Sequence, residues 1–244
     1  MAGFEPVGAG PFGAARRAAA HVLVDALDAP ELSEEDEHHL AAVLRLRPGE
    51  SVSVTDGKGG WRSCTWSGSG ALEPAGSVVQ VARPTPAVCV AFAPVKGDRN
   101  EWAVQKLSEL GVDRIVLLRT ERSVVRWDER RAASHVSRLR RVARQALMQS
   151  RGMWLSSVDG VVDIGAVDGS GGSALADPSG VALPAQVTSI LVGPEGGWSS
   201  SELEAFGAGA VSLGAGVLRT ESAAVAAGVL LTAVRAGVVA PARG

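Results

Sequence analysis

The chain has 244 residues, of which 46% are hydrophobic and 20% are charged, and its formal net charge is −2. These proportions are typical of folded globular proteins and exclude an intrinsically disordered chain. The length predicts a sizeable core and two domains, since one domain usually holds roughly 100–200 residues.

The start of the chain does not have the layout of a signal peptide, because His21 and Asp25 interrupt the apolar run AAAHVLVDALDA. The longest apolar run, residues 222–234, is shorter than the roughly 20 residues that a membrane-spanning helix needs. We therefore predict a cytoplasmic protein with no membrane partner.

Metal-ligating residues are sparse. Cys64 and Cys89 are the only cysteines, and they lack the C-x-x-C spacing of zinc sites. His38 and His39 are adjacent in sequence, so they project to different sides of a helix. The sequence predicts neither a disulfide nor a metal site.

Basic residues are concentrated in one segment. Residues 114–151 hold eleven arginines and three acidic residues, a local charge of +8, and the rest of the chain therefore carries −10. Such a face on an acidic protein either binds an anionic partner or is only solvated surface.

The first third of the chain reads as a small β-rich domain. Residues 33–47 predict a short helix that Ser33 caps and that ends before Pro48. Residues 51–66 alternate in polarity around Asp56-Gly57, which predicts a β-hairpin. The proline-containing segment RPTPA marks a boundary, so we predict one domain over residues 1–82 and a second over residues 86–244.

The second domain alternates strands with helices. Strands are predicted over residues 87–94, 113–120, 186–192 and 210–214, and helices over residues 98–111, 128–150, 199–206 and 220–237. Capping boxes are expected at Asp98 with Glu101 and at Ser199 with Glu202, and Thr220 is expected to cap the last helix. This alternation predicts an α/β domain with a mostly parallel sheet.

Two glycine-rich loops follow successive strands, at residues 193–197 and 214–216. Neither matches the phosphate-binding G-x-x-x-x-G-K-[ST] motif, and the second lacks the third glycine of the dinucleotide fingerprint. Each could be a tight strand-to-helix turn, but two together favour a shared pocket of backbone groups that suits a ligand such as adenosine. Glu195 in the first loop would suit a cationic ligand.

The paired stretches LVGPEGGWSSSELEAF and VSLGAGVLRTESAA resemble the carboxy-terminal motifs of the ribosomal RNA small subunit methyltransferase E family, knotted methyltransferases of the SPOUT superfamily. The resemblance continues upstream in KGDRNEWAVQKLSELGV, TERSVVRW and QALMQSR, and in HHLAAVLRLRPGESVSVTDGKG of the first domain. It therefore covers most of the chain in order.

This resemblance implies a PUA-like RNA-binding domain followed by a SPOUT-type parallel sheet whose C-terminal segment forms a trefoil knot. It also implies a homodimer that uses S-adenosylmethionine to methylate N3 of a uridine in 16S ribosomal RNA or the small ribosomal subunit. The alternatives are a non-catalytic RNA-binding or ribosome-assembly factor with this fold, and a SPOUT methyltransferase that acts on another RNA.

The resemblance also assigns site residues. Cofactor contacts are expected at Leu175, Asp177, Val192, Gly193, Pro194, Glu195, Gly196, Gly197, Leu213, Gly214, Leu218 and Thr220. The local charge of +8 separately favours RNA contact, which is expected at Arg99, Arg122, Arg126, Arg144 and Arg151.

Arg219 and Glu221 are the candidate catalytic residues. Arg219 would stabilise the negative charge on the uracil oxygens when N3 loses its proton, or it would pair structurally with Glu195 or Glu221. Glu221 is either a general base or a first-turn residue that the helix dipole favours. The sequence does not choose between these roles.

Overall fold

The computed structural model of the protein describes residues 13, 15, 17–68, 70–167, 172–207 and 209–241. The chain forms two compact units, the first from Met1–Arg83 with Leu147–Leu155 and the second from Pro84–Ala146 with Ser156–Gly244. The division expected from the sequence was continuous, whereas the structure groups Leu147–Leu155 with the first unit.

The first unit is built on a five-stranded sheet. Its strands are β1 (Ala20–Leu23), β2 (Ser51–Thr55), β3 (Gly60–Trp66), β4 (Leu72–Pro74) and β5 (Val79–Gln80). β1 pairs with β2 in parallel and β2 pairs with β3 antiparallel, which confirms the hairpin predicted at Asp56-Gly57. The Asp56 carboxylate accepts from the backbone N–H groups of Lys58 and Gly60 and so fixes this turn.

A short helical segment covers the core of the first unit. The Ser33 hydroxyl accepts from the backbone N–H of Asp36 and caps α2 (Glu34–His38), as predicted. The segment continues as η1 (His39–Val43), a π-helical turn, and ends earlier than the sequence predicted. Leu40 is 1% exposed and packs into the core with Val52, Val54 and Trp66.

His21 joins β1 to the returning segment Leu147–Leu155. Its Nε2–H donates to the Gly152 carbonyl at 3.0 Å, so the neutral ring has Nδ1 free to accept from the Ser53 hydroxyl at 2.7 Å. Burial and, to a smaller extent, the nearby Arg151 charge lower the pKa of His21 from 6.5 to about 4, although the hydrogen bond to Gly152 acts in the opposite direction. The ring is therefore neutral in the folded protein at neutral pH.

We expect the first unit to lose about 2 kcal/mol of stability between pH 7 and pH 5 because of His21. The folded pKa lies below the unfolded one, so stability is fully present above pH 6.5 and is lost as the pH falls towards 4. Urea unfolding at both pH values should show a steeper pH dependence in the wild type than in His21→Gln. Equal dependence in the two proteins would contradict the prediction.

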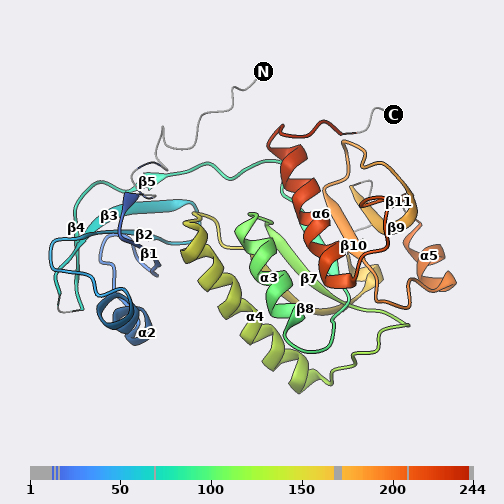
Figure 1. Ribbon diagram of the computed structural model, residues 1–244, viewed down its shortest axis with the longest axis horizontal. Helices are drawn as coiled ribbons and strands as arrows, with labels where there is room; N and C mark the ends of the chain where they lie inside the picture. The colour runs from blue at the N-terminus through green and yellow to red at the C-terminus, as the bar shows by residue number, and fades with distance from the viewer. Residues whose placement is uncertain are drawn as a thin grey trace. The chain divides into compact units, whose positions relative to one another are not determined.

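The second unit has a six-stranded, entirely parallel sheet in the order β11-β9-β10-β6-β7-β8, which confirms the predicted α/β architecture (Figure 1). Its strands are β6 (Cys89–Phe92), β7 (Arg114–Arg119), β8 (Ser157–Asp163), β9 (Ser173–Val181), β10 (Ser189–Val192) and β11 (Ala210–Val211). The short helix η2 (Ile164–Ala166) follows β8. β8 and β9 were not predicted, because Gly160, Pro178 and Gly180 interrupt their apolar pattern.

Four helices accompany this sheet, namely α3 (Arg99–Glu109), α4 (Glu129–Ser150), α5 (Ser200–Phe206) and α6 (Thr220–Arg235). α6 packs against β6, β10 and α3, and Figure 1 shows α3 and α6 side by side. The capping box predicted at Ser199 and Glu202 is present at the start of α5. The one predicted at Asp98 and Glu101 is wrong, because the Asp98 side chain caps nothing and Glu101 pairs with Arg138 at 3.0 Å.

Strand order reverses between β6 and β10. The chain runs outward from β6 through β7 to β8, crosses to β9, and returns to place β10 beside β6. In open parallel sheets, ligands bind outside the carboxyl ends of the strands at such a switch point. β10 ends at Val192, so the loop at residues 193–197 begins at this position. The trefoil knot implied by the resemblance stays a prediction.

Over the described parts of the chain, no helix combines the length and the hydrophobicity that crossing a bilayer requires.

Candidate active site

The two glycine-rich loops come together around a cavity of about 260 Å³ in the second unit. Ten of the twelve predicted cofactor residues line it: Asp177, Val192, Gly193, Pro194, Glu195, Gly197, Leu213, Gly214, Leu218 and Thr220. The cavity lies at the carboxyl end of β10, where the strand order reverses. The structure thus brings residues of β9, of the two glycine-rich loops and of α6, up to 47 positions apart in sequence, to one site.

The two other predicted cofactor residues lie behind the walls. Leu175 on β9 is 1% exposed and packs in the core of the second unit. Gly196 is exposed on the outer side of its loop, where its carbonyl accepts from Arg122 Nη1 at 3.1 Å. Both residues support the loops and do not line the cavity.

Thr220 connects the two loops. It was expected to cap α6, but the N-cap position is Arg219, and the Thr220 hydroxyl instead donates to the Gly193 carbonyl at 3.1 Å. Thr220 is 3% exposed, so this bond is shielded from water. The start of α6 and the end of β10 are therefore held together at the cavity.

Trp198 forms a wall that the sequence did not predict. Its Nε1–H donates to the Ala176 carbonyl at 3.2 Å, and its ring packs on Gly193, where an added Cβ would lie 3.0 Å from Cε2. The only hint in the sequence was an aromatic residue directly after the glycine run. The remaining unpredicted lining residues are Ala176, Pro178, Gly216, Val217 and Ala223.

The cavity is acidic. Asp177 and Glu195 are the only charged residues among the described residues that line it. Two hydrogen bonds from Ser179, through its hydroxyl and its backbone N–H, lower the pKa of Asp177, so it is a carboxylate at neutral pH. No group of three or more His, Cys, Asp or Glu side chains in the described ranges could hold a metal ion.

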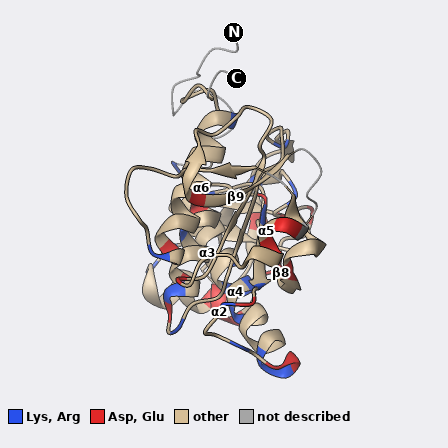
Figure 2. Cartoon of the chain, turned by 90° about the vertical axis from the view of Figure 1, so that its right-hand side faces the viewer, with Lys and Arg blue, Asp and Glu red and all other residues tan. Residues whose placement is uncertain are grey.

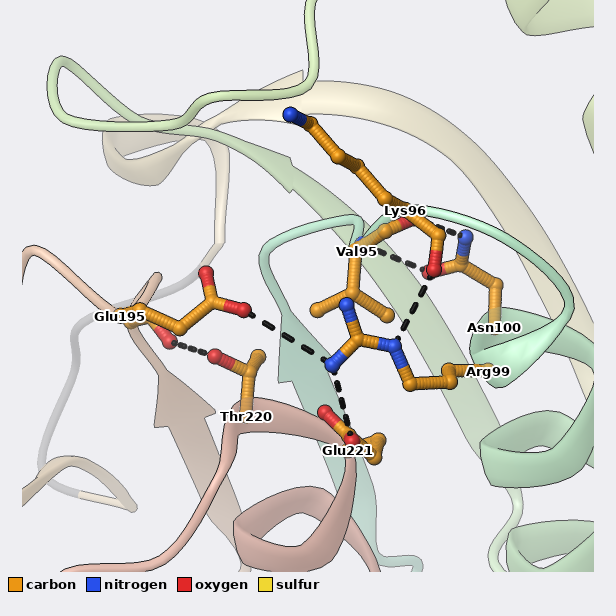
Figure 3. A network of polar contacts seen from close by, with 8 residues as sticks. Val95, Lys96, Arg99, Asn100, Glu195, Thr220 and Glu221 are labelled. Atoms are coloured by element: carbon orange, nitrogen blue, oxygen red, sulfur yellow. Dashed lines mark hydrogen bonds and ion pairs between the residues drawn. The ribbon is translucent and has the colours of Figure 1, made fainter.

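Arg99 at the start of α3 lies between two carboxylates (Figure 3). Its Nη1 is 3.0 Å from Glu221 Oε1 and 4.0 Å from Glu195 Oε1, and its Nε–H donates to the Lys96 carbonyl. The Asn100 Oδ1 accepts from the Val95 backbone N–H and its Nδ2–H donates to the Val95 carbonyl, which fixes the turn before α3. Arg99, which was predicted to contact RNA, thus links the loop at residues 193–197 to the start of α6.

The two candidate catalytic residues have different surroundings. Arg219 is exposed, and its side chain makes no hydrogen bond or ion pair with any described residue. Glu195 and Glu221, its two possible partners, both face Arg99 instead. Glu221 is 6% exposed, and its Oε2 is buried without a hydrogen-bond partner.

The other arginines predicted to bind RNA are dispersed. Arg122 and Arg126 lie in the segment between β7 and α4 and donate to the backbone carbonyls of Gly196 and Glu121. Arg144 lies on α4. Arg151 belongs to the first unit, has a φ of 58° and donates to the Ala15 carbonyl.

Part of the basic segment has structural roles. On α4, Arg138 pairs with Glu101 and Arg140 donates to the Val158 carbonyl, while Arg130 and Arg141 are exposed. In Figure 2 the red of Asp and Glu residues marks α5, which has no lysine or arginine. The basic surface therefore follows α4 and not the helix next to the cavity.

A second cavity of about 650 Å³ lies at the carboxyl ends of β7 and β8. Arg126, Trp127 and Glu202 are among its lining residues. The Glu202 carboxylate accepts from the backbone N–H groups of Glu121 and Ser199, so it ties the segment between β7 and α4 to the start of α5. These two bonds place the second cavity beside α5, the helix that follows the loop at residues 193–197.

Comparisons with known proteins agree with this architecture. A family model described as an RNA methyltransferase domain matches residues 83–232, and one described as an RNA methyltransferase PUA domain matches residues 32–68. The ribosomal RNA small subunit methyltransferase E of Mycobacterium bovis is 33% identical over 214 residues, which cover 79% of this chain and 82% of the relative. The chain belongs to the ribosomal RNA small subunit methyltransferase E family.

Solved structures resembling this methyltransferase E family chain match it over most of its length. A Legionella pneumophila protein in complex with bound S-adenosylmethionine is 27% identical, has a TM-score of 0.76 and covers 88% of this chain and 96% of its own. A ribosomal RNA small subunit methyltransferase E from Neisseria gonorrhoeae, 24% identical with a TM-score of 0.73 and covering 88% and 97%, shares the fold. The family and the fold class predicted from the paired motifs are confirmed.

Proposed function

We propose that this methyltransferase uses S-adenosylmethionine to methylate N3 of a uridine in 16S ribosomal RNA, as free RNA or within the small ribosomal subunit. The observation that carries the proposal is the acidic cavity built from both family motifs at the switch point of the sheet. The methyltransferase E relatives act on small-subunit ribosomal RNA according to their names, and the Legionella protein binds S-adenosylmethionine.

The cavity residues fit this cofactor. Glycines and backbone groups at residues 193–197 and 213–216 allow close approach of a nucleoside, and the lining described here has no lysine or arginine that would suit a phosphate. Asp177 uses one carboxylate oxygen for Ser179, which leaves the other for a ribose hydroxyl. When bound, the cofactor supplies a methyl group on a positively charged sulfur.

Arg219 is the residue that we assign to the reacting base. Loss of the N3 proton leaves negative charge on the two uracil carbonyl oxygens, and an unpaired guanidinium stabilises that charge. Arg219 precedes Thr220, which lines the cavity, and it is exposed. Glu221 has a supporting role in this proposal, because its carboxylate is buried and its Oε1 is held by Arg99.

RNA binding is assigned to two regions. The first unit contains the match to the RNA methyltransferase PUA domain, and α4 presents exposed arginines to phosphates.

We also assign the protein a homodimeric state. The side of α6 that faces away from the sheet is apolar, with Val229 at 44% exposure, and Trp102 on α3 is equally exposed. α3 and α6 pack together, so both residues belong to the same helical layer. A second copy of the chain would remove this apolar surface from water.

Nucleoside mass spectrometry of small-subunit ribosomal RNA tests the proposed reaction. A strain without the gene should lack one 3-methyluridine, and the wild-type gene should restore it. Undiminished 3-methyluridine in the deletion strain would contradict the proposal. Loss of a different methylated nucleoside would indicate another target, and an unchanged RNA with impaired subunit assembly would indicate a non-catalytic assembly factor.

A further inference from the structure

We propose that Glu195 makes the cavity prefer the positively charged cofactor over its neutral product, and so promotes release of S-adenosylhomocysteine. This inference rests on the proposed function, because it assumes that the cavity binds S-adenosylmethionine. It assigns a specificity-determining role to a carboxylate whose partner was left open by the sequence.

The charges around Glu195 do not cancel. Arg99 is the only cation that the described structure places within 4.0 Å of Glu195, and it also forms an ion pair with Glu221. Two carboxylates share one guanidinium, so the group keeps a net charge of −1. The Arg122 guanidinium is directed to the Gly196 carbonyl.

The remaining negative charge is concentrated on Glu195. Arg99 Nη1 is 3.0 Å from the Glu221 carboxylate, whose side chain is 8% exposed, but 4.0 Å from Glu195, whose side chain is 50% exposed. The shorter and drier contact is the stronger one, because Coulomb energy rises as distance and dielectric constant fall. Arg99 therefore neutralises Glu221 first, while Glu195 lines the cavity with most of its charge available.

The proposed reaction changes the charge of the molecule in this cavity. The carbon–sulfur bond of the methyl group breaks with its electron pair left on sulfur, and a nitrogen–carbon bond forms at N3, whose proton passes to water. A sulfonium cation thus becomes a neutral thioether, while the adenosine and amino acid parts are unchanged. A nearby carboxylate attracts the sulfonium but not the neutral thioether sulfur. It therefore favours binding of the substrate over binding of the product.

Calorimetry with three ligands tests this role. S-adenosylmethionine and sinefungin carry a positive charge at the reacting position, and S-adenosylhomocysteine does not. We expect Glu195→Gln to lower the affinity for the two cationic ligands by about tenfold. The affinity for S-adenosylhomocysteine should change by less than about twofold. Glu204→Gln, on the exposed surface of α5 outside the cavity lining, is the matched control and should change none of the three.

A second measurement on the wild type does not depend on the folding of a variant. Raising the salt concentration from about 50 to about 500 mM should reduce the preference for S-adenosylmethionine over S-adenosylhomocysteine, because the half-exposed Glu195 is screened. The same titration with Glu195→Gln should show a smaller change.

The outcomes separate this inference from the proposed function. If Glu195→Gln lowers the affinity for all three ligands equally, the inference is overturned, because Glu195 would then contact a group that substrate and product share. The inference is also overturned if Glu195→Gln keeps the preference for S-adenosylmethionine over S-adenosylhomocysteine, or if only Asp177→Asn loses this preference. In both cases cofactor binding itself, and with it the proposed function, would stand. If the wild type binds none of the three ligands, the proposed function itself fails.

Discussion

Replacing Arg219 with alanine is expected to lower the methylation rate by about a hundredfold to a thousandfold, while the affinity for S-adenosylmethionine changes by less than about twofold. The size of the effect is that of removing one preorganised donor from a site where negative charge develops. Arg219 is exposed and unpaired among the described residues, so its loss leaves no buried partner unsatisfied. The folded structure should therefore be unaffected.

Single-turnover methylation of small-subunit ribosomal RNA measures the effect on the rate, and calorimetry measures the affinity for S-adenosylmethionine. Glu204→Ala is a suitable control, because Glu204 is also exposed but lies on α5, outside the cavity lining. Arg219→Lys should recover part of the rate, since an ammonium keeps the charge without the planar donor pair. An equal loss of rate and of cofactor affinity in Arg219→Ala would make Arg219 a binding residue.

The sequence predicted features that depend on neighbouring residues. The Asp56-Gly57 turn, the Ser33 cap and the capping box of α5 are local, and the structure has all three. The glycine loops were located for the same reason, because they follow predicted strands and precede predicted helices. Family resemblance then supplied what local pattern could not, namely the identity of the domains.

Interactions between distant residues were not predicted. Arg99 and Glu221 are 122 positions apart, so no pattern in sequence joins them, and the expected partner of the acidic residues was instead Arg219. Thr220 was expected to cap its helix, but the backbone of Gly193, 27 positions away, offers its hydroxyl a shielded acceptor. The grouping of Leu147–Leu155 with the first unit likewise depends on tertiary contacts such as that of His21 with Gly152.

Gly193→Val should weaken S-adenosylmethionine binding by about a hundredfold, because it inserts a branched side chain between the two walls of the cavity. A Cβ at this position would already lie 3.0 Å from the Trp198 ring, which is 7% exposed and held through its Nε1–H to Ala176. Either the ring or the loop must move, and moving the loop also displaces the carbonyl that Thr220 binds. RNA affinity should stay within about twofold, since phosphate contacts to the first unit and α4 supply most of it.

Gly160→Val is the matched control for this substitution. A Cβ at Gly160 on β8 would meet nothing within 4 Å, and valine is favoured in strands, so cofactor binding should be retained. Calorimetry on both variants, with circular dichroism to verify that each is folded, measures the difference. If Gly193→Val binds S-adenosylmethionine as the wild type does, the wall formed by Gly193 and Trp198 does not belong to the cofactor site. Weakening by both variants would instead indicate a general loss of stability, because only Gly193 lies against the Trp198 ring.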